Sequence, residues 1–319
     1  MYQCSFVAAL AAAVNLTLAS AAPVEEAGQP NVVHLPNPYS GHISSGKGGH
    51  RSGGSSIKYH GGPVMLGTVK VYAIWYGGWT FDGTFSNPTT IVADFLHVIG
   101  GSPYYNINTT YYMSLNGANA FVTNSVAYAG AFTDNYSQGA GPLSDFQIEE
   151  IVAGAINSSG AGPDPNGIYF VLTSPDVTKS GFCSSYCGWH THAYIDGVDV
   201  KYSFVGDAAI QCPGGCTANT GVSPNGDVGG DGMVSIIAHE LEEAASDEDL
   251  NAWYDSGGYE NADKCAWTFG TVHRLSNGAW WNMILPDPTA QPGNTTTSRY
   301  YLIQRNWVNS GSGYCALSY

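Results

Sequence analysis

The most restrictive feature of this chain is the uninterrupted apolar segment Gly167-Ile-Tyr-Phe-Val-Leu-Thr173. A strand without polar alternation is typical of a sheet that is covered on both faces. Helical patterns supply the cover, because capped segments with apolar faces occur at residues 88–98, 144–156 and 231–245. The segment therefore predicts a layered fold with a buried sheet, rather than a helical bundle or a β-sandwich.

The remaining strand patterns set the order of the elements. Short runs rich in β-branched and aromatic residues predict strands at residues 69–75, 111–115, 120–124, 192–195, 202–205, 279–285 and 300–303. Combined with the helices, this order predicts an α/β (α+β) fold with a twisted mixed sheet and packed helices. A zincin-like site helix lies behind the sheet, and a smaller, loop-rich, disulfide-bonded part follows.

The N-terminal region reads as a targeting segment followed by a leader. Residues 5–19 are almost entirely apolar or small, and Ala19-Ser-Ala21 has the form of a signal-peptidase site. We predict a signal peptide at residues 1–21, a flexible Gly-, Ser- and His-rich leader or propeptide at 22–57, and one folded domain at 58–319. No later apolar run reaches the ~18 residues that span a membrane, so we expect a secreted, extracellular or cell-wall protein.

The negative net charge of the chain argues against two classes of partner. The formal net charge is −15, and such an acidic surface repels nucleic acid and anionic lipid. We therefore expect neither as a partner.

Cysteines and glycosylation signals support an extracellular location. Six cysteines remain after removal of the signal peptide, and an even count in a secreted chain favours three disulfides. We predict two local bridges, Cys183–Cys187 and Cys212–Cys216, and a third, Cys265–Cys315. A zinc site formed by the first four thiolates is the alternative. N-x-S/T sequons mark possible glycan sites at Asn108, Asn135, Asn157 and Asn294.

The strongest functional signal is His-Glu-Leu-Glu-Glu at residues 239–243. Residues four apart share one face of a helix, so His239 and Glu243 are placed to hold one metal ion. Glu240, beside them, is placed to act as the general base for a water molecule. The motif is short, and an acidic helix with a buried or capping histidine is the alternative. Glu242 is a departure, because it puts a charge where metalloprotease helices keep an uncharged residue.

Further ligands must come from another segment, because catalytic zinc takes three protein ligands and keeps one position open. Glu260 and Asp263 follow Glu243 by 17 and 20 residues. We predict Glu260 as the third ligand, with Asp263 as a second candidate or as a partner that orients the histidine. An ordinary turn is the alternative. A set of one imidazole and two carboxylates suits zinc, and also Mn²⁺ or Ca²⁺.

Two other segments carry candidate ligands. His190 and His192 follow Cys187 closely, and they either complete the metal site or act on substrate, or belong to a surface loop. Asp227 and Asp231 lie in a Gly-rich loop that resembles a calcium loop without the EF-hand order of ligands. A helix N-cap is the simpler role for Asp231. The chain has no G-x-S-x-G motif, and no cysteine is left as a nucleophile.

Several blocks together resemble the EXORDIUM family, also called phosphate-induced proteins. They are Tyr59-His-Gly-Gly-Pro-Val64, Val71-Tyr-Ala-Ile-Trp-Tyr-Gly77, Gly181-Phe-Cys183 with Cys187-Gly-Trp-His190, Gln211-Cys-Pro-Gly-Gly-Cys216 and Pro224-Asn-Gly-Asp-Val-Gly-Gly-Asp-Gly-Met233. The blocks occur in order from about residue 58 to the C-terminus. The resemblance implies secretion to the cell wall or apoplast, and it is to the microbial branch that retains the H-E-x-x-E residues.

Two functions follow as hypotheses. The first is a secreted, metal-dependent hydrolase, most simply a peptidase, with one divalent ion, zinc in the first place, on His239, Glu243 and Glu260. The second is a non-catalytic protein that binds wall polysaccharide through aromatic side chains such as Trp79, Trp253 and Trp280, with a structural metal. A metal-dependent glycan hydrolase lies between the two. An extracellular protein or a cell-wall glycan is the expected partner.

Overall fold

A central sheet of five strands organises the protein, which is described here from a computed structural model covering residues 56–288 and 298–319. The predicted signal peptide, nearly all of the predicted leader and the sequon at Asn294 lie outside the described residues. In spatial order the strands are β5 (Val126–Asp134), β2 (Val69–Tyr76), β6 (Gly167–Thr173), β8 (Val198–Gly206) and β7 (Gly188–Ile195). The first four run parallel, and β7 is an antiparallel edge strand paired with β8.

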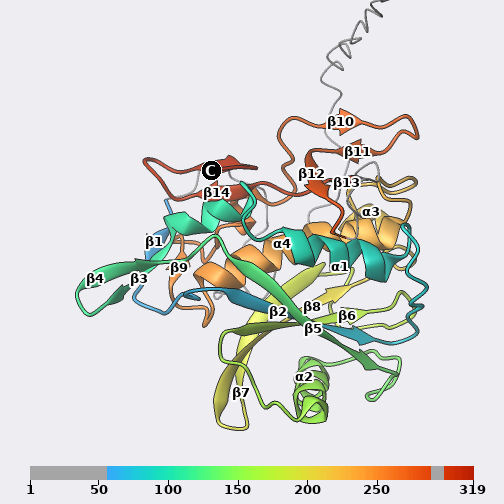
Figure 1. Ribbon diagram of the computed structural model, residues 1–319, viewed down its shortest axis with the longest axis horizontal. Coiled ribbons are helices and arrows are strands. Elements are labelled where there is room, and N and C mark those ends of the chain that lie inside the picture. Colours follow the sequence, from blue (N-terminus) through green and yellow to red (C-terminus); the bar gives the residue numbers. More distant parts are fainter. Residues whose placement is uncertain (1–55, 289–297) are drawn as a thin grey trace, which may run out of the picture.

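The central position of β6 explains its apolar sequence. All seven of its residues are buried, as the continuous apolar run predicts. Helices α1 (Pro88–Val98) and α4 (Val228–Ser246) lie on one face of the sheet, and α2 (Asp145–Ser159) lies on the other (Figure 1). The predicted mixed α/β fold with packed helices is confirmed.

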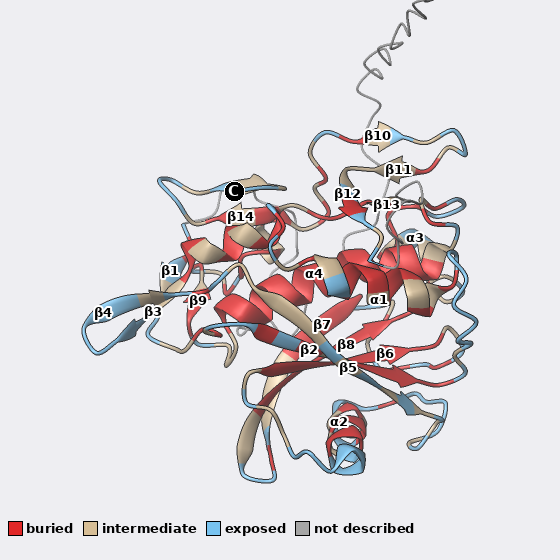
Figure 2. Cartoon of the chain, in the orientation of Figure 1, coloured by how far each residue is buried: buried red, intermediate tan, exposed pale blue. Residues whose placement is uncertain are grey.

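The first two helices begin at the predicted caps. The side chain of Asn87 accepts a hydrogen bond from the Thr89 amide at the start of α1. Ser144 and Gln147 form a reciprocal capping box at the start of α2. Each helix is buried along one face, and the outer face of α2 is exposed (Figure 2).

Helix α4 is different, because every residue from Gly229 to Ser246 is buried (Figure 2). Its first turn packs so closely that a Cβ on Gly229 would lie 2.2 Å from Asp207 Oδ1. Because glycine has no Cβ, the first turn of the helix can lie this close to Asp207. The helix begins one turn before Asp231. The N-cap is Asp227, whose side chain accepts from the Gly230 amide, so the predicted cap at Asp231 is wrong.

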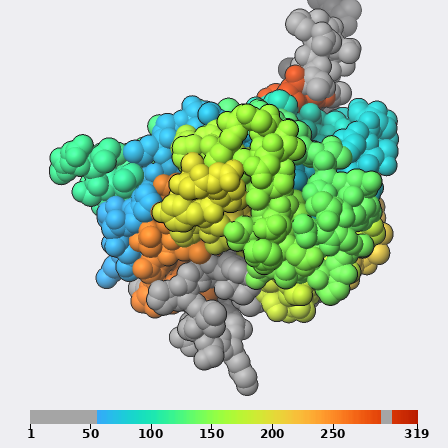
Figure 3. All heavy atoms as spheres, turned by 90° about the horizontal axis from the view of Figure 1, so that it is seen from below, coloured from blue at the N-terminus to red at the C-terminus, as the bar shows by residue number. Residues whose placement is uncertain are grey.

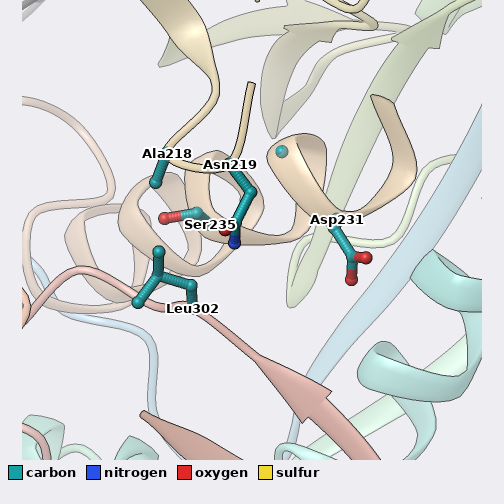
Figure 4. A pocket seen from close by; sticks show the side chains of 6 residues that line it. Ala218, Asn219, Asp231, Ser235 and Leu302 are labelled. Carbon is teal, nitrogen blue, oxygen red and sulfur yellow. The ribbon is translucent and has the colours of Figure 1, made fainter. Parts of the chain in front are cut away.

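The loop that resembles a calcium loop uses its carboxylates internally. Asp231 accepts hydrogen bonds from the Asn225 amide at 2.8 Å and from Asn225 Nδ2 at 2.5 Å. A cavity of about 10 Å³ lies beside it, next to Asn219, Ser235 and Leu302 (Figure 4). This volume is about that of one water molecule, so the cavity is too small for a ligand.

The rest of the chain forms paired short strands and helical turns. The pairs are β1 (Lys58–Tyr59) with β9 (Trp253–Tyr254), β3 (Tyr112–Leu115) with β4 (Ala118–Phe121), β10 (His273–Arg274) with β11 (Trp280–Trp281), β12 (Met283–Pro286) with β13 (Ser298–Tyr301), and β14 (Asn306–Val308) with β15 (Tyr314–Ala316). The helical turns are α3 (Pro213–Cys216), η1 (Tyr105–Thr110) and η2 (Asp263–Cys265). This agrees with the predicted loop-rich C-terminal part. In the part of the chain that the structure describes, no helix is both long and apolar enough to cross a membrane.

The disulfides correct two of the three predicted pairings. Cys183 pairs with Cys212 and Cys187 pairs with Cys216, so the local bridges are wrong, and the four thiols are not free to bind zinc. Two parallel bridges instead join the segment before β7 to the segment around α3. The predicted bridge Cys265–Cys315 is confirmed.

The burial of each side chain shows which of the predicted glycan sites and surface tryptophans are accessible. Asn108 is fully buried against Asn261, which leaves no room for a glycan at that sequon, whereas Asn135 and Asn157 are exposed. Trp253 is buried among tyrosines and cannot serve as the predicted surface contact. Trp79 and Trp280 are half-buried.

Candidate metal centre

Helix α4 brings the predicted pair of ligands together. His239 Nε2 lies 3.0 Å from Glu243 Oε1, one helical turn away on the same face. Glu240 belongs to the same group, because donor atoms of His239, Glu240 and Glu243 all lie within 4.8 Å of one another.

The turn η2 and the residues before it place both downstream carboxylates beside this pair. The Asp263 amide donates a hydrogen bond to Glu243 Oε1 at 3.0 Å. Asp263 Oδ1 lies 3.5 Å from His239 Nε2. Glu260 lies on the other side of Glu243, and its nearest imidazole is that of His190 rather than that of His239.

His190, from the edge strand β7, is the member whose role the sequence leaves open. Its Nδ1 lies 3.5 Å from Glu240 Oε2 and 3.6 Å from Glu243 Oε2, and its Nε2 lies 3.6 Å from Glu260 Oε1. The side chain is only 1% exposed, so a surface-loop role is wrong for this residue. The only sequence signal for this position is the alternation of a strand, which turns every second side chain toward the helix behind the sheet.

Several facing atoms of this cluster lack hydrogen-bond partners. Among the described residues, the orphaned buried atoms include His190 Nδ1 and Nε2, Glu240 Oε2, Glu243 Oε2, and Glu260 Oε1 and Oε2. Buried polar groups are nearly always paired, and leaving one unpaired costs about 1–3 kcal/mol. The concentration of orphaned nitrogen and oxygen atoms at one point therefore fits a cation between them.

Burial and mutual charge shift the pKa values in opposite directions. Burial lowers the pKa of His190, but Glu240 and Glu243 outweigh it and raise that pKa to about 10. Burial raises the pKa of Glu240 to about 7 against the charges of His190 and His239. Burial also raises the pKa of Glu243, but the two imidazoles lower it to about 2. The pKa of Glu260 rises well above its usual value through burial and then through the neighbouring carboxylates.

The donor set and spacing suit a divalent metal. Zinc bonds of ~2.0–2.1 Å in a tetrahedron separate two ligand atoms by about 3.4 Å. The separations from His239 Nε2 to Glu243 and Asp263 are 3.0 and 3.5 Å. The side chains of His239 and Asp263 are 9% and 8% exposed, whereas that of Glu243 is fully buried, so the former two lie nearest the surface among these three residues.

His192 belongs to a different group on the neighbouring surface. Its Nδ1 lies 2.9 Å from Asp199 Oδ1 and 3.7 Å from Asp249 Oδ1. The ammonium of Lys201 occupies this group, at 2.6 Å from Asp249 and 3.0 Å from Asp199. Figure 3 shows the β7–β8 hairpin (yellow) beside the segment after α4 (orange), which this ion network joins. A lysine already supplies the positive charge here.

Glu242, the departure from the protease pattern, points away from the cluster. Its Oε2 accepts a hydrogen bond from Asn306 Nδ2 at 2.6 Å, and the residue is fully buried. Burial raises the pKa of Glu242 well above its usual value, which favours the neutral carboxylic acid over the charged form.

Fold and site together define a mixed α/β protein whose buried central helix carries one imidazole and several carboxylates. A second imidazole lies on the edge strand β7, and these groups are the donor types of a metal centre. The chain belongs to the family of the phosphate-induced protein 1 conserved region, which matches residues 57–316. It is 32% identical over 288 residues to protein EXORDIUM-like 3 of Arabidopsis thaliana, covering 81% of this chain and 82% of that protein. It is also 32% identical to EXORDIUM-like 5 of Arabidopsis thaliana, covering 79% and 75%. Protein PHOSPHATE-INDUCED 1 of Nicotiana tabacum is 28% identical, covering 62% and 67%. The resemblance seen in the sequence is confirmed, and no solved structure matches the chain.

Proposed function

We propose that this protein is a secreted, metal-dependent hydrolase whose metal is held by His239, Glu243 and Asp263. The observation that carries the proposal is the separation of 3.0 and 3.5 Å from His239 Nε2 to the two carboxylates. Asp263 takes the place first predicted for Glu260, because Glu260 faces His190 instead. Zinc is the ion that such a site would be expected to hold, and the carboxylates also suit Mn²⁺.

The roles of the side chains follow from their positions. A bound divalent ion would polarise a substrate carbonyl and lower the pKa of water. Glu240 lies within 4.8 Å of the donor atoms of His239 and Glu243 without being needed as a ligand. Its carboxylate accepts a proton from water and passes it to the leaving group.

A peptide is the substrate class that this arrangement favours, and the extracellular space is the proposed place of action. Peptide bonds are hydrolysed by a polarised carbonyl, an activated water and a carboxylate that returns the proton. The three disulfides support secretion, because such bridges persist in oxidising compartments.

A binding role for cell-wall polysaccharide has its own support. A groove of about 630 Å³ lies between α1 and β5, at the opposite edge of the sheet from β7. Phe81 and Tyr128 line it together with Thr89, Thr90 and His97. Aromatic faces with hydroxyl and imidazole groups beside them suit a sugar ring.

Measuring peptide hydrolysis and bound metal in the same variants distinguishes the hydrolase from the polysaccharide-binding role. We would screen the metal-loaded protein against a library of quenched fluorescent peptides, with Glu240→Gln as the test variant and Glu150→Gln, on the exposed side of α2, as the matched control. Hydrolysis that is lost by about 10²-fold or more in Glu240→Gln, with bound metal unchanged, supports the hydrolase. Glu150→Gln keeps full activity. Equal activity of wild type and Glu240→Gln would reject it, and glycan-array binding would then test the groove.

A further inference from the structure

Glu243 faces two imidazoles with its two oxygens. Oε1 lies 3.0 Å from His239 Nε2, on the less deeply buried side, and Oε2 lies 3.6 Å from His190 Nδ1, on the inner side. A carboxylate with one oxygen directed to each of two nitrogen donors has the arrangement of a bridging ligand.

The inner side forms a complete donor set of its own. Donor atoms of His190, Glu243 and Glu260 all lie within 4.8 Å of one another. Both nitrogens of His190 and both oxygens of Glu260 lack a hydrogen-bond partner, and each side chain is 1% exposed. The 3.6 Å between His190 Nε2 and Glu260 Oε1 is too long for a hydrogen bond and close to the spacing of two ligands on one ion.

The charge of the four carboxylates also favours a second cation. The carboxylates of Glu240, Glu243, Glu260 and Asp263 would carry four negative charges in a buried volume when ionised. One divalent ion leaves half of that charge uncompensated, and burying unpaired charge costs several kcal/mol per ion. A second divalent ion brings the sum to zero with both imidazoles neutral, which is the form in which histidine binds metal.

We propose that a second divalent cation binds on the inner side, held by His190, Glu243 and Glu260, with Glu243 shared between the two ions. This inference rests on the proposed function for the outer ion. Glu240 Oε2 lies 3.5 Å from His190 Nδ1, beside the ring nitrogen that does not face Glu260. Because its ligands are more deeply buried than His239 and Asp263, the inner ion serves to fix Glu243 and to balance charge rather than to contact substrate.

Metal stoichiometry tests the inference. The full-length secreted protein is dialysed against Zn²⁺ and, separately, Mn²⁺, and its metal is counted by plasma mass spectrometry. The inner-site variants are His190→Ala and the isosteric Glu260→Gln, which keeps the side-chain volume if the alanine variant does not fold. His192→Ala is the matched control, since this histidine is on the same strand but belongs to the lysine-filled group. Electron paramagnetic resonance of the Mn²⁺ form reports whether the ions are coupled.

We expect two ions per chain in wild type and His192→Ala, and one in His190→Ala, Glu260→Gln and His239→Ala. The Mn²⁺ spectrum should be that of a coupled pair in wild type and of an isolated ion in the variants. One ion in wild type that survives His190→Ala and Glu260→Gln but not His239→Ala would overturn the inner site and leave the proposed function standing. One ion that survives His239→Ala but not His190→Ala would overturn the proposed outer ion and the sharing of Glu243, and would leave a single ion on the inner ligands. Two uncoupled ions would overturn the shared carboxylate, and no bound ion in folded protein would reject both proposals.

Discussion

The paired bridges before α4 allow a quantitative test of how the site is held in place. Cys183–Cys212 and Cys187–Cys216 each span 29 residues, and Cys187 lies three residues before His190. In the chain-entropy account, closing a loop of that length stabilises the fold by about 3.5 kcal/mol. Once one bridge exists, the second closes only a short path of about nine residue lengths, which contributes about 2.5 kcal/mol.

Double substitutions separate this arrangement from local pairing. Cys183→Ala with Cys212→Ala removes one bridge and should lower the free energy of unfolding by about 2.5 kcal/mol. Cys183→Ala with Cys187→Ala breaks both bridges and should lower it by about 6 kcal/mol. If the bridges were local, the ranking of the two variants would reverse. Cys183→Ala with Cys187→Ala would then remove one four-residue loop and about 2 kcal/mol of stability, whereas Cys183→Ala with Cys212→Ala would remove two such loops.

Equilibrium urea unfolding without reductant gives the free energies, and thiol titration of the denatured variants gives the pairing. We expect no free thiol in the first variant and two in the second, with Cys265–Cys315 intact in both. A smaller loss of stability in Cys183→Ala with Cys187→Ala, without free thiols, would refute the reasoning.

Three further predictions address the packing around the site. Gly188→Ala would place a Cβ 2.5 Å from Ile236 Cγ2 and 3.1 Å from Glu240 Oε1, so we expect a loss of about 1–3 kcal/mol and weaker metal binding, measured by thermal unfolding and metal titration. Gly154→Ala, in α2 with no atom within 4 Å of the new Cβ, should instead stabilise by up to about 1 kcal/mol, and equal losses in both variants would contradict the packing argument. Arg299→Ala leaves the buried carboxylate of Asp94 without its partner at 2.6 Å and should cost about 3–5 kcal/mol in urea unfolding, and a loss below 1 kcal/mol would show that the pair is not buried. Burial raises the pKa of Asp231 from 3.8 to about 6, so the folded state binds this proton more tightly and its contribution to stability falls by about 3 kcal/mol as the pH rises from about 4 to 6. Asp231→Asn should flatten that part of the pH profile, and an unchanged slope would exclude this carboxyl as its source.

The parts of the fold that the sequence predicted correctly are those with local causes. The continuous apolar run gave β6 its buried position, and side-chain caps set the starts of α1 and α2 at Asn87 and Ser144. Strand β5 was not predicted. Its sequence is rich in Ala and Gly, its residues alternate between exposed and half-buried, and its place in the sheet depends on pairing with β2. No local sequence pattern predicts that pairing.

The site shows the same division between local and distant causes. The helical spacing of His239 and Glu243 was sufficient to place them together. The inward direction of His190, the choice between Glu260 and Asp263, and the crossed disulfides depend on how β7, η2 and α3 pack around α4. Such contacts join residues tens of positions apart, and neither periodicity nor spacing encodes them.

The most direct test of the metal centre is X-ray diffraction from crystals of the secreted protein, recorded on both sides of the absorption edge of the metal it carries. We expect an anomalous peak between His239 Nε2, Glu243 Oε1 and Asp263 Oδ1. Electron density that shows these side chains in place with no anomalous peak among them, in crystals grown with zinc or manganese, would contradict it.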